Sequence, residues 1–183
     1  MLDYEFWYII SIPLCIIFLI FEILKKTSWK TIFFHSLVFF YCVAVISIVI
    51  FPLPFQKELI EDSKAESFLH NNFIPFRSII DIASNNSLFI SMKQIVGNTI
   101  LLLPFGFFTP FIWHSLHQFR KAFFVGLFTS TGIEIIQFCI SFILGFTYKI
   151  TDVDDIILNT VGFIFGYFFY KMFQAGSEDQ TNT

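Results

Sequence analysis

The stretch KITDVDDIILNTVGFIFGY (residues 149–167) places three aspartates directly before an apolar segment of membrane-spanning character. Asp155, Asn159, Gly162 and Gly166 follow one another at intervals of four, three and four residues, so they share one face of a helix. The two glycines form a small-xxx-small pair that lets another helix approach closely. We expect that partner to be the preceding span. Capping of the helix N-terminus accounts for one or two of the aspartates but not for Asn159.

The composition of the chain points to a membrane protein. Of its 183 residues, 56% are hydrophobic, and only 14% are charged, against roughly 25% in a soluble domain. A soluble protein of this length could not bury so much apolar surface, so we expect the lipid bilayer to be its main partner. The net charge of −3 offers no basic surface for nucleic acid.

Five segments are long enough to cross a bilayer, which takes about 20 apolar residues. They span residues 4–24, 31–51, 94–113, 122–145 and 155–173, within a few residues. The predicted fold is therefore an all-α polytopic membrane helix bundle of about five transmembrane helices. The first segment lacks the basic start and the cleavage site of a signal peptide.

The distribution of basic residues predicts the orientation of the bundle. Most of the basic residues that lie in short loops or at the end of a span occur in the first loop, in the third loop and at the end of the last span. They are Lys25, Lys26, Lys30, Arg120, Lys121 and Lys171. Basic short loops face the cytoplasm. The N-terminus and the loop at about residues 55–93 then lie outside, and a disordered tail, residues 174–183, lies in the cytoplasm.

The fourth span carries a narrow stripe of small and polar residues. Gly126, Ser130, Glu134, Gln137 and Ser141 step by four, four, three and four residues along an otherwise apolar helix. A charge at the bilayer centre costs about 2.5–3.5 kcal/mol on insertion scales. We therefore expect Glu134 to be neutral, paired or facing a wet cavity, and we expect Gln137 or Glu134 to meet Asn159 across the interface with the fifth span.

The topology brings the costly polar residues together. Asn98 lies near the outer end of the third span, and the aspartates lie near the outer end of the fifth. We predict a pocket in the outer leaflet that is open to the exterior. Its ligand-binding candidates are Arg77, Asn98, Glu134, Gln137, Lys149, Asp152, Asp155 and Asn159.

Four motifs in order carry a resemblance to a known family. NFIPF (72–76), GNTILLLPFGFFTP (97–110), GIEIIQ (132–137) and TDVDDIILNTVG (151–162) resemble the VanZ-like family over about residues 35–173. The resemblance implies a VanZ-like domain at residues 31–173, preceded by a first helix and basic loop at residues 1–30. Many members carry Arg before the aspartates where this chain has Lys149, and Lys cannot bind phosphate or carboxylate as a bidentate fork.

The resemblance also implies a role for the chain. The family's namesake is associated with resistance to the glycopeptide teicoplanin, so we expect a protein of the bacterial plasma membrane. In that role the pocket would bind a cell-envelope lipid, a lipid-linked wall precursor or the lipidated antibiotic.

Two alternatives remain beside binding. One is an intramembrane enzyme that modifies an outer-leaflet lipid with Glu134 or Asp155 as general base. The other is a non-catalytic scaffold whose polar stripes lock the helices together. No common hydrolase, nucleotide-binding or Cys/His metal motif occurs, so we favour binding over catalysis and expect no cofactor. A divalent cation held by Asp152 and Asp155 is a weaker option, because hard cations need several convergent oxygens.

Overall fold

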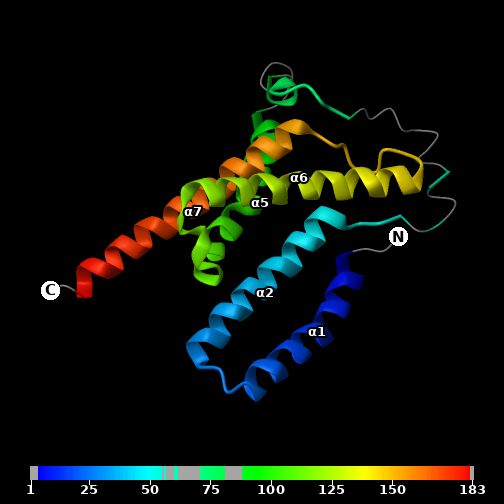
Figure 1. Cartoon of the computed structure of the whole chain (residues 1–183). Coiled ribbons are helices and arrows are strands. Elements are labelled where there is room, and N and C mark those ends of the chain that lie inside the picture. The colour runs from blue at the N-terminus through cyan, green and yellow to red at the C-terminus, as the bar shows by residue number, and fades with distance from the viewer. Residues whose placement is uncertain (1–3, 55, 57–59, 62–70, 81–87, 182–183) are drawn as a thin grey trace. The chain divides into compact units, whose positions relative to one another are not determined.

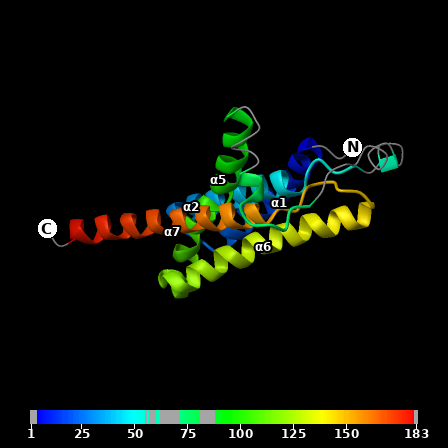
Figure 2. The same cartoon turned by 90° about the horizontal axis from the view of Figure 1, so that it is seen from above.

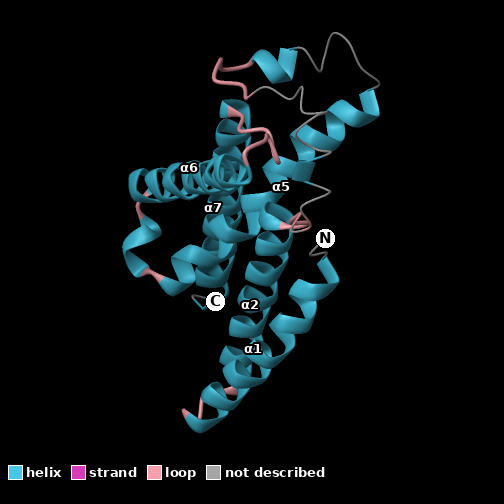
Figure 3. Cartoon of the chain, turned by 90° about the vertical axis from the view of Figure 1, so that its right-hand side faces the viewer, coloured by secondary structure: helices cyan, strands magenta, loops and turns pink. Residues whose placement is uncertain are grey.

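The computed structural model describes residues 4–54, 56, 60–61, 71–80 and 88–181 (Figure 1). Its elements are α1 (Tyr4–Leu24), α2 (Trp29–Ile50), α5 (Leu88–Ile112), the short 3₁₀ helix η1 (His114–His117), α6 (Phe119–Leu144) and α7 (Val153–Thr181). Five of these helices are long and apolar enough to cross a membrane. This confirms the predicted all-α, five-helix membrane fold. Figure 3 shows helices and loops, with no strand in the part of the chain that it colours.

Residues 1–67 form one compact unit and residues 68–183 another. The first two spans therefore belong to one compact unit, and the predicted domain boundary after residue 30 stays a prediction. In the α1–α2 hairpin the Trp7 indole N–H donates to the Val43 carbonyl at 2.9 Å. At the other end of the hairpin, His35 Nδ1 lies 3.2 Å from Glu22 Oε1. These polar contacts orient two helices that share an apolar interface.

Local sequence signals set the ends of two helices. The Ser28 hydroxyl accepts the backbone N–H of Thr31 at 3.3 Å and caps α2. At the end of α6, Gly145 adopts a left-handed conformation with φ of 75°. Glycine reaches this conformation without a Cβ penalty, which allows the chain to turn back toward α7.

The glycines of the fifth span pack against α5 rather than α6. A Cβ at Gly162 would collide with the carbonyl of Thr99, and one at Gly166 with the carbonyl of Leu103. The expectation that these glycines face the fourth span is therefore wrong. The small-xxx-small pattern predicts close contact with another helix but does not identify that helix. Figure 2 shows α5 crossing α7 at this contact.

The polar stripe of α6 does face α7, as predicted. The Ser130 hydroxyl donates to the Ile156 carbonyl at 3.2 Å. Gly126 leaves room for the fully buried ring of Phe163, because a Cβ there would lie 2.8 Å from the ring. Helix α7 is thus held between α5 and α6.

Helix α7 continues to Thr181. Residues 174–181, predicted to be disordered from their polar composition, are therefore helical. The segment contains no proline, and helix propagation from a stable span adds one hydrogen bond for each residue that is fixed.

Candidate functional site

The start of α7 is bound to a distant loop, residues 71–80, which we call the clip. Asn72 and Asp152 form an isolated parallel β-bridge. The Asn72 N–H donates to the Thr151 carbonyl at 2.9 Å, and the Val153 N–H donates to the Asn72 carbonyl at 3.0 Å. The Asn71 side chain also accepts the N–H of Thr151 at 3.0 Å. The clip is therefore fixed to the chain that enters α7.

Asp152 caps α7 and holds the clip with the same carboxylate. Its Oδ1 accepts the Asn72 amide and the backbone N–H of Asp154, both at 2.8 Å. Its Oδ2 accepts the Ser78 hydroxyl at 2.5 Å. Asp152 is only 3% exposed, so both of its oxygens are committed to bonds within the protein.

Asp154 holds the other end of the clip. It is 1% exposed and accepts the backbone N–H groups of Phe76 at 2.5 Å and Ile79 at 3.2 Å. Phe76 has φ of 65°, a conformation that is uncommon for a bulky residue. Asp154 thus stabilises a backbone turn that the Phe76 side chain alone would disfavour.

Asp155 points to the opposite side, toward α5. The Asn98 amide donates to its carboxylate, and Gln94 is a further hydrogen-bond donor to it. Asn98 and Asp155 were both candidates, and the structure brings them together. They form an interhelical polar contact between α5 and α7.

Glu134 of α6 approaches the same turn from the other side. It is 3% exposed, and its Oε2 accepts the backbone N–H of Asp152 at 3.1 Å. Its predicted contact with Asn159 is not formed. Asn159 is 1% exposed, and its Oδ1 has no hydrogen-bond partner in the described part of the chain. Glu134 reaches the start of α7, whereas Asn159 lies seven residues beyond Asp152, about two helical turns deeper.

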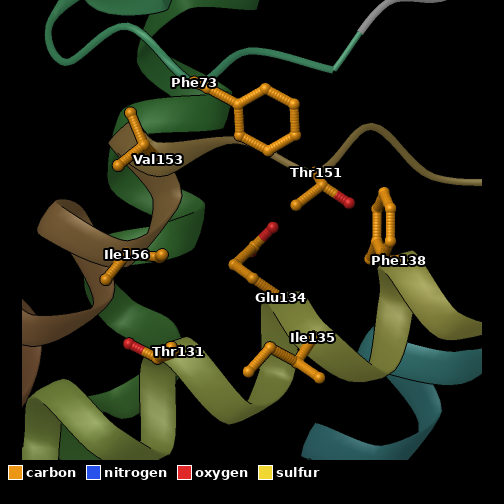
Figure 4. A pocket seen from close by; sticks show the side chains of 8 residues that line it. All are labelled: Phe73, Thr131, Glu134, Ile135, Phe138, Thr151, Val153 and Ile156. Carbon is orange, nitrogen blue, oxygen red and sulfur yellow. The ribbon is translucent and has the colours of Figure 1, made fainter.

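A cavity of about 270 Å³ lies beside the Glu134 side chain (Figure 4). It is lined by Phe73, Thr131, Glu134, Ile135, Phe138, Thr151, Val153 and Ile156. Most of this lining is apolar, and the Glu134 side chain points in between Phe73 and Thr151. The Thr151 hydroxyl is buried and has no partner among the described residues. The accessible surface of the cavity is therefore apolar, and the buried Thr151 hydroxyl does not face into it.

Lys149 lies close enough to interact electrostatically with Glu134. Burial lowers the pKa of the Lys149 ammonium to about 8, although the charge of Glu134 opposes that shift. The loop that carries Lys149 is held by Ser141, whose hydroxyl donates to the Lys149 carbonyl at 3.3 Å. Lys149 was a ligand-binding candidate, and the structure places it near Glu134.

The remaining candidates lie outside the cavity lining. Arg77 is exposed on the clip, and Gln137 is half-buried on α6. In the described ranges no group of three or more His, Cys, Asp and Glu residues is placed to hold a metal ion. Both Asp152 oxygens accept hydrogen bonds and Asp155 is bonded to Asn98, and the option of a divalent cation at these two residues stays a prediction.

Sequence reasoning missed several residues of this site. Asn72 and Ser78 were not singled out, and Asp154 was counted only as one of the three aspartates before the fifth span. Asn72 lies in the NFIPF motif, so the motif itself was the available signal. Neither position has a helical periodicity that would show its contact with α7.

These features define a polytopic helical membrane protein in which buried carboxylates gather at one end of a three-helix core. A family profile described as VanZ/LLP1 matches residues 34–174. The chain therefore belongs to the VanZ/LLP1 family, which confirms the resemblance seen in the four motifs. No curated protein shows a significant match to the chain, and neither does any solved structure.

Proposed function

We propose that this protein binds an amphiphile of the bacterial cell envelope in the cavity beside Glu134, and that this binding underlies a role in glycopeptide resistance. One observation carries the proposal. The buried Glu134 side chain borders an apolar cavity of about 270 Å³ on the membrane-spanning helix α6. Ionisable residues inside membranes are costly and are usually functional.

The exposure of the lining suggests how a ligand would enter. Phe73, Ile135 and Phe138 are 67%, 56% and 43% exposed, so the cavity is open on their side. Ile135 and Phe138 belong to a membrane-spanning helix, whose exposed apolar side chains contact lipid. An amphiphile would therefore enter sideways from the bilayer.

The size of the cavity limits what it can hold. Ligand pockets for drug-sized molecules measure about 300–1,000 Å³, and this cavity lies just below that range. The cavity has room for one segment of a ligand's apolar chain and one polar group. A complete glycopeptide would remain outside, with only its acyl chain or one substituent bound, and the same holds for a lipid-linked wall precursor.

The orientation predicted from the basic loops supports a site in the outer half of the plasma membrane. Lys25, Lys26, Arg120 and Lys121 lie in or beside the first and third short loops, and basic short loops face the cytoplasm. An outer-leaflet site would meet wall precursors and lipidated glycopeptides, which is where a resistance protein would act.

Catalysis by Glu134 is the second candidate. Its carboxyl group borders the cavity and would lie within reach of a bound ligand, as a general base must. Asp155 is a weaker candidate, because it is not among the lining residues and accepts hydrogen bonds from α5.

The test is teicoplanin susceptibility in a sensitive host that expresses the wild type or a variant at matched membrane levels. Glu134→Ala should abolish the protection that the wild type confers. The control is Ile143→Ala on the same helix, an 81% exposed position that should keep wild-type protection. Glu134→Gln separates the two candidates, since an amide can still hydrogen-bond a ligand but cannot act as a base. If Glu134→Ala protects as well as a protective wild type, the cavity is not the working site.

A further inference from the structure

We infer that the clip, residues 71–80, is a membrane-embedded segment whose apolar side chains contact the acyl chains of the leaflet in which α7 begins. This inference does not depend on the proposed function, because it concerns the lipid contacts of the clip and not a ligand of the cavity. Three features of the clip support it: the depth at which it is fixed, its exposed side chains and the pairing of its backbone.

The contact between Glu134 and Asp152 fixes the depth of the clip. Arg120 and Lys121 lie in the first turn of α6, and basic residues at the end of a span lie at the membrane surface. Glu134 lies about 20 Å beyond Lys121 along the helix axis, whereas the hydrocarbon core is about 30 Å thick. Because Glu134 accepts the Asp152 N–H, the start of α7 lies about 10 Å inside the opposite boundary of that core, and a tilt of α6 would place it deeper. Asn72 bonds the clip to the same turn.

The apolar side chains of the clip face away from the protein. Four large ones are each more than half exposed, namely Phe73, Ile74, Phe76 and Ile80. Phe73 borders the same cavity as Ile135 and Phe138 of α6 (Figure 4). Those two side chains are exposed on a membrane-spanning helix, where lipid covers them. The apolar surface of the clip is therefore continuous with a surface that contacts lipid.

The backbone of the clip is paired in the way that an irregular segment inside a membrane requires. An unpaired backbone N–H is costly in hydrocarbon, so such a segment must find acceptors within the protein. Pro75 has no N–H. The backbone N–H groups that donate to protein acceptors are those of Asn72, Ile74, Phe76, Arg77, Ile79 and Ile80. Asp154 supplies two of these acceptors, which explains why a buried carboxylate lies at the mouth of an apolar span.

Arg77 is compatible with this depth. It is the one charged residue in the sequence of the clip, and it is exposed. An arginine can lay its apolar stem along lipid while its guanidinium reaches the head groups. The clip therefore combines apolar contacts with the acyl chains and one charged contact with the membrane surface.

Depth-dependent fluorescence quenching tests the inference. Full-length variants with a single tryptophan, in a background where Trp7, Trp29 and Trp113 are replaced by phenylalanine, are reconstituted into phosphatidylcholine–phosphatidylglycerol vesicles. Ile74→Trp and Ile80→Trp place the tryptophan at exposed positions of the clip, where it fits without repacking. Ile143→Trp, on the exposed apolar surface of α6, is the reference for lipid, and Ser177→Trp, near the polar end of α7, is the reference for water. Each tryptophan is quenched by phospholipids brominated on the acyl chain and, separately, by aqueous iodide.

We expect both clip tryptophans to resemble Ile143→Trp. Acyl-chain bromine should quench them at least threefold more strongly than Ser177→Trp, and iodide at least threefold more weakly. A quenching pattern closer to that of Ser177→Trp would place the clip in water and overturn the inference. Protection from both quenchers would mean that protein covers the clip, either the first unit of the chain or a second copy, and would overturn the inference as well.

Asp154→Ala in the Ile74→Trp variant tests the role of the backbone pairing. Without this carboxylate the N–H groups of Phe76 and Ile79 lose their acceptors, so the clip should move toward water and iodide quenching should rise at least twofold. Glu5→Asn in the same variant is the control and should leave quenching unchanged. Equal iodide quenching in the two variants would contradict the role of Asp154 in holding the clip in the membrane.

Discussion

Glu134 Oε2 on α6 accepts the backbone N–H of Asp152 at 3.1 Å. Because Asp152 also caps α7 and holds the clip, this one bond connects the cavity, the helix start and the loop. A ligand that binds Glu134 would therefore also affect the clip. The two acidic residues differ in role: Asp152 supports the fold, and Glu134 borders the cavity.

Asp152 is predicted to stabilise the folded protein. Asp152→Ala removes three hydrogen bonds to a carboxylate, each worth about 1.5–3 kcal/mol to a charged group. We expect a clear drop in the melting temperature of the purified protein, by about 4 °C or more. Asp152→Asn should be milder, because its carbonyl oxygen can still accept two of the bonds. Glu5→Asn on exposed α1 is the control. A melting temperature of Asp152→Ala equal to that of the control would contradict the capping role.

The α5–α7 contact is predicted to depend on glycine. Gly162→Ala should lower thermal stability and expression, because the new Cβ meets the backbone carbonyl of Thr99, which cannot move as a side chain can. Gly132→Ala in α6 is the matched control, since a Cβ there has open space around it. That control should be neutral or slightly stabilising, by about 0.4–1 kcal/mol. The packing account fails if the two variants have the same melting temperature.

Lys149 is predicted to titrate near pH 8 in the folded protein. Its pKa is lowered from 10.5, so between about pH 8 and 10.5 the unfolded state binds more protons and stability rises with pH. Glu134→Gln removes the charge that opposes the shift, so it should lower the pKa of Lys149 further. The pH dependence of acylation at the Lys149 amine, followed by mass spectrometry, measures this. An unchanged acylation profile in Glu134→Gln would show that the two groups do not interact.

Much of the fold could be predicted from the sequence because membrane solvation leaves a strong signal. Five long apolar segments predicted five helices, and the stripe through Ser130 and Glu134 predicted which face of α6 contacts α7. The partner of Gly162 could not be predicted, because a small-xxx-small pattern fits any neighbouring helix. The helical conformation of residues 174–181 was not predicted, because their polar composition does not show that the helix of the fifth span continues into them.

The sequence predicted the part of the site that lies on helices but not the part that lies in the loop. Asn98 and Asp155 were placed together because the topology brings the outer ends of their helices to one level. Asn72 and Ser78 lie in a loop, where neither period two nor period 3.6 applies. Their bonds to Asp152 depend on tertiary structure, so sequence reasoning assigned Asp152 to a ligand when its oxygens are committed to the clip.

The orientation of the bundle is predicted to be N-terminus outside and C-terminus inside, on the basis of the basic loops. Ser177 is exposed near the end of the span formed by α7. In a variant whose native cysteines are replaced by serine, Ser177→Cys should react with a membrane-impermeant maleimide only after the cells are permeabilised. Labelling in intact cells would overturn the orientation and move the cavity to the cytoplasmic half.

The most direct test of the central claim is a crystal structure grown from a lipidic phase that contains dodecanol. The account predicts density that enters between Ile135 and Phe138 and ends beside the Glu134 side chain. A cavity that is closed by contact between Phe138 and Thr151, with the amphiphile bound elsewhere on the protein, would contradict it.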